Sequence, residues 1–208
     1  MFKTQLRAIL RAAAGYEVKM MIPMISSIEE LRRSKEILEE VKTELRREGF
    51  EFSDNVSLGI MIETPAAVAI ADLLADECDF LSLGTNDLAQ YTLAVDRTNE
   101  RVAKLYQPFH PALLRLVKET IDAGHARGKW VGMCGEMAGM KKAIPLLLGL
   151  GLDEFSMAPR LIPEAKWLIR QYDQSRSRRI ASQALTFHTA VEVEQYLTEE
   201  MKAVGAEF

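Results

Sequence analysis

The chain has 208 residues, of which 48% are hydrophobic and 27% are charged, and its formal net charge is −4. These values are ordinary for a soluble globular domain with its own core, and without a basic balance a nucleic-acid partner is not expected. The longest strongly apolar stretch, residues 143–152, has about half the length of a membrane-spanning helix, and no secretory signal is recognisable. We therefore expect a cytoplasmic protein without membrane insertion.

Short apolar runs alternate with longer amphipathic segments along the chain. Segment 26–49 is the clearest amphipathic helix, because Ser27 has capping-box spacing to Glu30 and Gly49 supplies a stop. Thr64, placed before a proline, predicts another helix start directly after an apolar run. Strands are predicted at 18–24, 56–63, 79–84, 130–134 and 154–157, and helices at 6–13, 26–49, 65–75, 110–127, 139–150, 160–171, 175–184 and 190–204.

This alternation of strands and helices predicts an α/β fold with a parallel sheet. Strand 56–63 is continuously apolar, which is typical of a parallel strand that is covered on both faces. About 25 residues follow the third strand before the helix at 110–127, and we expect a helical piece within them, because a bare loop of that length is unusual. Neither a Gly-x-Gly-x-x-Gly nor a Gly-x-x-x-x-Gly-Lys-Ser/Thr motif is present, so the sequence does not indicate a nucleotide-binding fold.

Four candidate site residues fall at the carboxyl ends of predicted parallel strands, where the active sites of α/β sheets and barrels are built. They are Glu63, Asn86, Asp87 and Cys134. Glu63 and Asp87 are separated by about one βα unit, so we expect them at the tips of neighbouring strands, where two carboxylates suit Mg²⁺. Either carboxylate alone could instead cap the helix that follows it, whereas the pair, with Asn86 adjacent, favours metal binding.

Arg97 and Cys134 each allow a functional and a structural interpretation. Arg97 offers a planar, permanently charged donor set for phosphate or carboxylate, or else it forms an ion pair with Asp96 or another nearby acid. Cys134, in the segment MCGE, is either a small core residue or a reactive thiol. Cys78 is interpreted as structural. The two cysteines form no disulfide or zinc pattern, and no histidine is assigned a catalytic role.

Three segments carry more specific motifs, namely IMIETPAAVAIADLLADECDFLSLGTNDLAQYTLAVDR, LYQPFHPALLRLV and GKWVGMCGE. They resemble the family of enzyme I of the bacterial sugar phosphotransferase system, the phosphoenolpyruvate–protein phosphotransferases, and the resemblance covers nearly the whole chain. Pyruvate phosphate dikinase and its relatives also carry Gly-Thr-Asn-Asp-Leu, so a dikinase-like relative is the alternative, but ETPAA, YTLAVDR and LYQP favour enzyme I. The resemblance implies a phosphoenolpyruvate-binding (βα)₈ TIM-type barrel at the carboxyl end of a longer, homodimeric enzyme.

The resemblance also implies roles for individual residues. Glu63 and Asp87 match Mg²⁺ ligands, and Asn86 and Asp87 match a pair that contacts phosphoenolpyruvate. Arg97 matches a substrate-binding arginine, and Cys134 matches the proton donor that converts the enolate to pyruvate. The chemistry is consistent, because a metal and fixed cations stabilise the charge that develops on the enolate oxygen, and a free thiol with a pKa of about 8.5 is mostly protonated at neutral pH.

In this family the phosphoryl group passes to a histidine on an amino-terminal domain and then to a small histidine-containing carrier protein. Five predicted strands are fewer than the eight of a barrel, so we expect residues 1–208 to form a partial barrel domain, without the phosphohistidine and carrier-binding domains. Two hypotheses follow. The chain is part of a working catalytic domain that binds Mg²⁺-phosphoenolpyruvate, or it is an inert folding or dimerisation module. In this family, further substrate-binding arginines lie on the strands that are missing here, so we expect the isolated chain to have weak activity or none.

Overall fold

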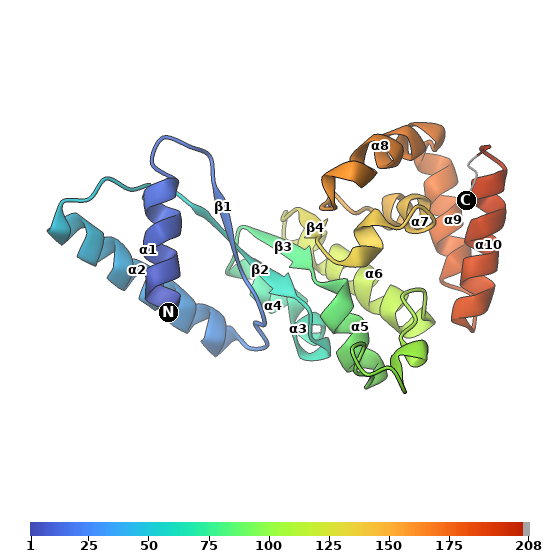
Figure 1. Ribbon diagram of the computed structural model, residues 1–208, viewed down its shortest axis with the longest axis horizontal. Coiled ribbons are helices and arrows are strands. Elements are labelled where there is room, and N and C mark those ends of the chain that lie inside the picture. The colour runs from blue at the N-terminus through green and yellow to red at the C-terminus, as the bar shows by residue number, and fades with distance from the viewer. Residues whose placement is uncertain (206–208) are drawn as a thin grey trace.

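The computed structural model describes residues 1–205, in which strands and helices alternate along the chain (Figure 1). The strands are β1 (Lys19–Ile22), β2 (Ser57–Ile62), β3 (Phe80–Leu83), β4 (Val131–Met133) and β5 (Glu154–Phe155). The α-helices are α1 (Phe2–Ala12), α2 (Ile28–Glu48), α3 (Pro65–Ala69), α4 (Ala71–Asp76), α5 (Thr85–Leu93), α6 (Pro111–Ala126), α7 (Ala143–Leu150), α8 (Ile162–Gln171), α9 (Gln174–Ala184) and α10 (Ala190–Lys202). Three short 3₁₀ helices are η1 (Ala103–Leu105), η2 (Glu136–Gly139) and η3 (Pro159–Leu161). All five predicted strands are confirmed, with shorter bounds.

The five strands form one parallel sheet in which they lie in chain order, from β1 to β5. In this order every strand pairs with the strand that precedes it, as in the wall of a βα barrel. A doubly wound sheet would instead reverse its strand order at a switch point. The predicted α/β fold of (βα)₈-barrel type is therefore confirmed, with five strands in the described residues.

One face of this sheet, which we call the helix face, carries the main hydrophobic core. Strand residues alternate between the two faces, and every second residue of β1 to β4 is an aliphatic side chain that the helices cover. Helix α6 packs directly on this face, because a side chain at Gly124 would contact Leu81 and Val131. The buried members of the helix face are Met20, Ile22, Leu58, Ile60, Ile62, Leu81, Leu83, Val131 and Met133.

The opposite face, which we call the inner face, has a different composition. Its residues are Gly59, Met61, Phe80, Ser82, Trp130, Gly132 and Glu154, with Glu63, Gly84, Cys134 and Ser156 following at the carboxyl ends of the strands. Phe80 and Trp130 stack with their ring centroids 4.3 Å apart. Any side chain at Gly59 would overlap the ring of Phe80, so this glycine makes room for the stacked pair. The inner face is thus layered, as barrel interiors are.

The helix starts follow from local sequence signals. Ser27 caps α2 by accepting a hydrogen bond from the Glu30 N–H, and Thr64 caps α3 by accepting one from Ala67. The prediction of one helix over 65–75 is wrong in detail, because the chain breaks at Ile70 into α3 and α4. The helical piece expected after β3 is confirmed as α5, which starts at once. The helix predicted at 139–150 starts later, as α7 at Ala143, and the 3₁₀ helix η2 precedes it.

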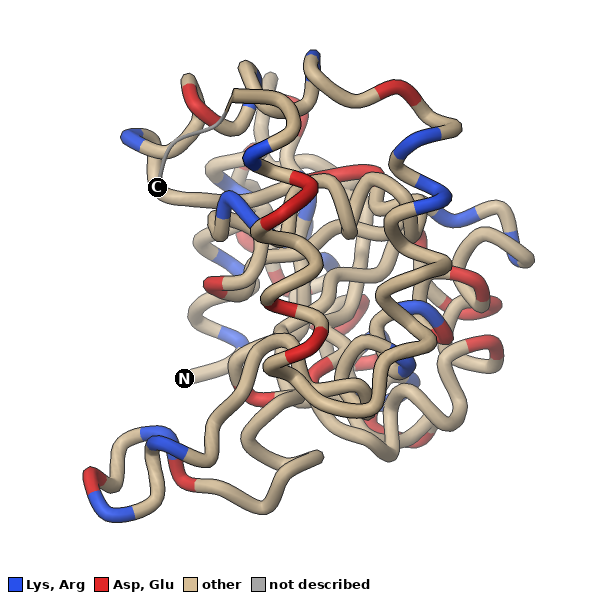
Figure 2. Tube along the Cα trace, turned by 90° about the vertical axis from the view of Figure 1, so that its right-hand side faces the viewer, with Lys and Arg blue, Asp and Glu red and all other residues tan. Residues whose placement is uncertain are grey.

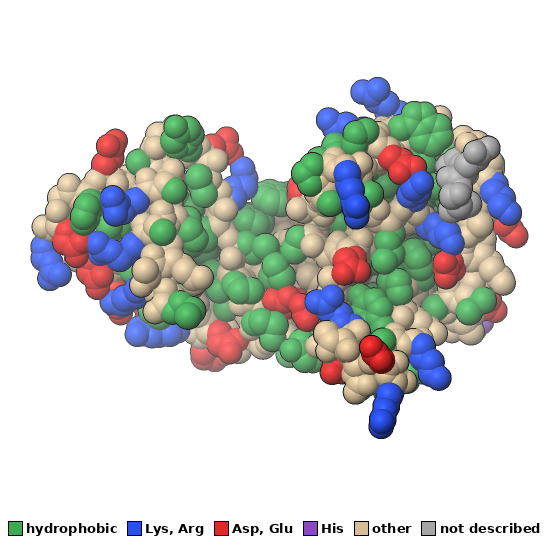
Figure 3. Space-filling view, in the orientation of Figure 1, with side chains coloured by type: hydrophobic (Ala, Val, Ile, Leu, Met, Phe, Trp, Pro, Cys, Tyr) green, Lys and Arg blue, Asp and Glu red, His purple; other side chains and the backbone are tan. Residues whose placement is uncertain are grey.

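Charged residues are spread along the whole chain, with acidic and basic positions interspersed (Figure 2). In the view of Figure 3, hydrophobic side chains gather over the centre of the molecule, between the end formed by α1 and α2 and the end formed by α7 to α10. A second, smaller core cluster joins α7, α8 and α10 through Ile144, Leu168 and Met201. Among the described residues, no helix combines the length and the apolarity that crossing a membrane requires.

Candidate active site

Glu63 directly follows β2 and is almost completely buried at the carboxyl edge of the sheet. Its Oε1 accepts a hydrogen bond from the backbone N–H of Met24, at 2.7 Å. Burial is the largest cause of a raised pKa at Glu63. The Met24 N–H acts in the opposite direction, and the charge of Asp87 and a side-chain hydrogen bond with it add to the rise. A buried carboxylate with so few partners is a group that a cation would stabilise.

Asp87 and Asn86 lie in the first turn of α5, whose N-cap is Gly84. The sequence placed them at the tip of β3, and the structure shows that the helix starts there without an intervening loop. Neither Glu63 nor Asp87 caps a helix by a side-chain hydrogen bond, since Thr64 caps α3 and α5 has no such cap. The capping alternative is therefore wrong, and the two carboxyl groups are instead close enough to interact.

Gly84 keeps the space beside the Glu63 carboxylate open. A Cβ at this position would stand 2.8 Å from both Cβ and Oε2 of Glu63. Among residues 1–205, no group of three or more His, Cys, Asp or Glu side chains is arranged to hold a metal ion. Two carboxylates are nevertheless the number that Mg²⁺ commonly takes from a protein, with water and phosphate oxygens completing its octahedron. The residues present therefore fit this ion in kind and in number.

Cys134 follows β4 and is exposed, so the interpretation as a core residue is wrong. Its backbone N–H donates to the Leu83 carbonyl at 3.1 Å, which ties it to the end of β3. The hydroxyl of Ser82 donates to Sγ at 3.5 Å, from the inner face of the neighbouring strand. Cys78, by contrast, is buried, and burial raises its pKa to about 11. The one thiol is accessible beside the site, whereas the other belongs to the core.

Arg97 lies beyond α5, where its side chain approaches η2. Its Nη1 is 3.7 Å from Oε1 of Glu136, while Asp96 accepts hydrogen bonds from Thr98 instead. The alternative ion pair is thus present, but with a residue that follows Cys134 on another segment. Because this pair is largely exposed to solvent, it holds Arg97 only weakly and leaves the guanidinium available to an anionic ligand.

Glu136 is a residue of the site that sequence reasoning missed. Its backbone N–H donates to Oδ1 of Asn86 at 3.0 Å, and its carboxylate pairs with Arg97. Tyr106 is a second missed residue. Its pKa is raised by burial and by the charge of Glu136, with Asp87 adding to the rise and Arg97 opposing it. Glu136 follows Cys134 in the segment MCGE, and Tyr106 lies in the segment LYQP, and these two motifs were the available sequence signals.

Met24 is a third missed residue, which acts through its backbone. It has a φ of 58°, in the left-handed region that a non-glycine residue adopts at a cost of about 1–3 kcal/mol. In this conformation its N–H reaches Oε1 of Glu63, so the loop after β1 orients a carboxylate at the end of β2. No pattern in the sequence indicates a left-handed methionine.

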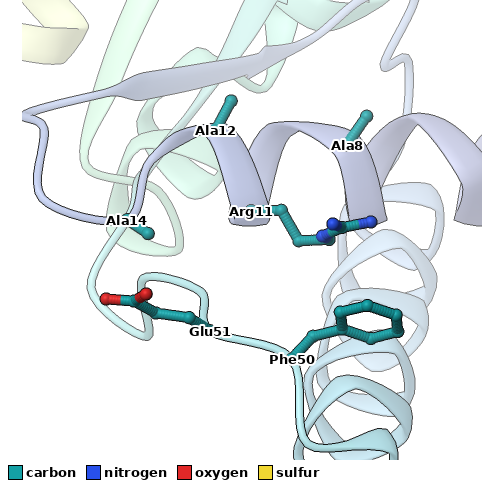
Figure 4. Close-up of a pocket in the computed structure, with 6 residues that line it drawn as sticks. All are labelled: Ala8, Arg11, Ala12, Ala14, Phe50 and Glu51. Carbon is teal, nitrogen blue, oxygen red and sulfur yellow. The ribbon is translucent and has the colours of Figure 1, made fainter.

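A cavity of about 540 Å³ lies beside these residues, on the side of β5. It is lined by Asn86, Cys134, Gly135, Glu136, Gly139, Met140, Ser156, Met157, Ala158, Arg160 and Leu161. Another cavity, of about 480 Å³, lies between α1 and residues 50–51 (Figure 4). Arg11 covers the ring of Phe50 there at 4.3 Å, and three alanines complete most of the wall, so that cavity offers little chemistry. The first cavity is the one that adjoins the predicted site residues.

Comparison with known proteins gives a consistent picture. Residues 1–174 match the family described as PEP-utilising enzyme, PEP-binding domain. The chain is 55% identical over 193 residues to the phosphoenolpyruvate-protein phosphotransferase of Listeria monocytogenes, covering 93% of this chain and 34% of the relative. It is 52% identical over 201 residues to that of Staphylococcus carnosus, covering 97% and 35%. The chain thus spans about a third of the length of the curated relatives it matches.

Among solved structures, a citrate lyase from Burkholderia xenovorans LB400 has a similar fold. The two superimpose with a TM-score of 0.61 over 99% of this chain and 70% of that one, at 18% sequence identity. At this identity the likeness concerns the fold alone. It agrees with the barrel-type order of the strands.

Proposed function

This chain belongs to the family of phosphoenolpyruvate-utilising enzymes, and we propose that it carries the Mg²⁺-phosphoenolpyruvate site of a phosphoenolpyruvate–protein phosphotransferase. The reaction is the transfer of the phosphoryl group to a protein histidine, the first step of sugar uptake by the phosphotransferase system. One observation carries this proposal. Glu63 is buried at the carboxyl edge of the sheet, and Asp87, from the next βα unit, contributes to the rise of its pKa.

In the proposed site, Glu63 and Asp87 would hold the metal, and the absence of a side chain at Gly84 leaves the space beside Glu63 free. When bound, Mg²⁺ supplies positive charge to the phosphoryl and enolate oxygens. The Met24 N–H fixes one oxygen of Glu63 and leaves the other for the ion. A carboxylate with one oxygen bound to the backbone and one left for a metal fits a cation that takes few ligands from the protein.

Asn86, Asp87 and Arg97 are proposed to bind the substrate. Asn86 is oriented by the Glu136 N–H, which occupies its Oδ1 and so turns its amide donors elsewhere. Arg97 exchanges its weak contact with Glu136 for the substrate phosphate or carboxylate, which accept its planar donor set more strongly. Positive groups are needed here because the site otherwise gathers three carboxylates, from Glu63, Asp87 and Glu136.

Cys134 is proposed as the proton donor to the methylene carbon of the enolate, which then becomes pyruvate. Its S–H bond breaks as the C–H bond forms, leaving a thiolate that regains a proton from solvent. The support is its exposure beside the cavity and its contact with the Ser82 hydroxyl, which donates to sulfur and would stabilise the thiolate.

The wider assembly is proposed by similarity to the longer relatives. The phosphoryl acceptor would be a histidine on an amino-terminal domain, and the next acceptor a small histidine-containing carrier protein. The enzyme would act in the cytoplasm as a homodimer. Residues 1–208 would form the partial barrel domain of this enzyme, so substrate affinity of the isolated chain should be weaker than that of the full-length Listeria relative.

Calorimetric titration of the chain with phosphoenolpyruvate, with and without Mg²⁺, tests the proposal. We expect heat of binding that requires the ion, and we expect Asp87→Asn to weaken binding about a hundredfold, or ~2.7 kcal/mol, while circular dichroism stays unchanged. The matched control is Asp122→Asn, because Asp122 pairs with Lys118 on the exposed side of α6, away from the site. Binding that is independent of both Mg²⁺ and Asp87 would remove the metal site from the proposal.

A further inference from the structure

The cavity beside Cys134 has an unusual distribution of charge. Two charged residues, Glu136 and Arg160, are among those that line it, together with polar groups from Asn86, Cys134 and Ser156. Asn86 comes from the first turn of α5, and the others come from the ends of β4 and β5 and from the segments that follow these strands. The cavity is therefore the continuation of the proposed site toward β5, and Arg160 is part of its wall.

The two charges are not equivalent. Glu136 has a cationic partner in Arg97, at 3.7 Å, which offsets its charge. Within residues 1–205, the side chain of Arg160 makes no ion pair, hydrogen bond or ring contact, whereas Arg32 and Arg176, for example, pair with Glu77 and Glu200. The cavity is thus lined by an uncompensated guanidinium, whose planar donor set suits phosphate or carboxylate.

We propose that Arg160 makes this cavity a binding subsite for the negative charge of a small phosphorylated or carboxylic acid. The identity of that acid as phosphoenolpyruvate rests on the proposed function, but the uncompensated charge of Arg160 does not. The guanidinium of Arg160 would contact the anion in the cavity that Asn86 and Cys134 also line. It adds a positive charge to a site that has three carboxylates and only Arg97 to balance them.

The thiol of Cys134 reports the potential of the cavity directly, because both residues line it. We compare the alkylation rates of the chain with iodoacetate, which is an anion, and with iodoacetamide, which is neutral. The ratio of the two rates does not depend on the fraction of Cys134 that is thiolate, because both reagents react with the same sulfur. We expect Arg160→Gln to lower the iodoacetate-to-iodoacetamide ratio about fivefold at low salt, with a smaller change at high salt. An unchanged ratio would overturn the proposal.

Lys166→Gln is the matched control. It removes one positive charge from α8, close to Arg160 in sequence, but Lys166 does not line the cavity. We expect its ratio to stay within twofold of the unsubstituted chain, and Arg160→Lys to restore most of the value lost in Arg160→Gln. An equal fall in Lys166→Gln and Arg160→Gln would mean a general effect of net charge, and would overturn the assignment to Arg160.

Calorimetry with Mg²⁺ and phosphoenolpyruvate separates this inference from the proposed function. If the unsubstituted chain binds, Arg160→Gln should weaken binding about tenfold and Lys166→Gln should not, and equal affinity in Arg160→Gln would contradict a substrate contact. If the unsubstituted chain does not bind while the alkylation ratio still depends on Arg160, this chain lacks the proposed phosphoenolpyruvate site and the anion subsite stands.

Discussion

The two faces of the sheet have opposite chemistry, although they are built from alternate residues of the same strands. On the helix face, Leu58, Ile60 and Ile62 of β2 are buried beneath helices. On the inner face the same strand offers Gly59 and Met61, and then Glu63 at its end. The helix face consists of aliphatic side chains that fit one another, whereas the inner face mixes glycine, serine, methionine, two stacked aromatic rings and carboxylate.

This difference separates the sources of stability and of function. Burial of aliphatic side chains on the helix face stabilises the sheet by about 25 cal/mol per Å² of apolar surface removed from water. The inner face leads to the carboxyl edge, where Glu63, Ser82 and Cys134 make polar contacts that do little for the core. A substitution should therefore affect either stability or ligand chemistry, according to the face on which it falls.

The largest expected effect breaks the helix face. Ile60 is fully buried, and Ile60→Ala should lower the free energy of unfolding by about 2–5 kcal/mol, because it removes apolar contacts and leaves a cavity. Met61→Ala, the next residue along β2, should cost clearly less, because Met61 lies on the inner face and is only half-buried. Urea denaturation of both variants measures the difference. Equal losses would show that the two faces contribute equally to the core.

Much of the fold could be predicted from the sequence, because its signals are local. The apolar run of β2 and the caps at Ser27 and Thr64 depend on residues that are close in the chain, and each was found. The break at Ile70 was not, because the segment has a continuous helical pattern. The barrel-type strand order was predicted from the resemblance to a known family, because hydrophobic periodicity does not indicate which strands pair.

The site could be predicted only in part, for a related reason. Residues at strand ends, such as Glu63 and Cys134, can be located once the strands are known. The contacts that complete the site join distant segments: Met24 with Glu63, and Glu136 with Asn86. Such pairs depend on tertiary structure and on backbone conformation, so a single sequence contains no direct sign of them.

The second expected effect contrasts the two cysteines. In the folded chain, iodoacetamide should label Cys134 and leave Cys78 unmodified, because Cys78 is buried and its pKa is raised to about 11. The reactive form is the thiolate, so a raised pKa keeps Cys78 protonated until the pH nears 11, and its labelling should stay slow below that value. Mass spectrometry of labelled chains between neutral and alkaline pH measures both sites.

Two controls make this contrast decisive. Cys134→Ser should take up no label while folded, and both the variant and the unsubstituted chain should label Cys78 once urea unfolds them. Rapid labelling of Cys78 in the folded chain near neutral pH would contradict the comparison, since it would mean that the strand carrying Phe80, to whose carbonyl Cys78 donates, opens readily.

The smallest expected effect concerns the exposed link across the carboxyl edge. Glu136→Gln removes a largely exposed ion pair with Arg97, so the free energy of unfolding should change by less than about 1 kcal/mol. The pKa of Tyr106 should nevertheless fall. After burial, the charge of Glu136 is the next cause that raises this pKa. Without that charge the tyrosinate is easier to form, while the opposing effect of Arg97 remains.

Ultraviolet titration of tyrosinate in Glu136→Gln, with Tyr106→Phe to identify the signal and Glu194→Gln as an exposed acidic control, measures this shift. If Tyr106 titrates identically in Glu136→Gln and in the unsubstituted chain, the charge of Glu136 does not act on Tyr106 across the carboxyl edge. The inner face would then differ from the helix face in composition only.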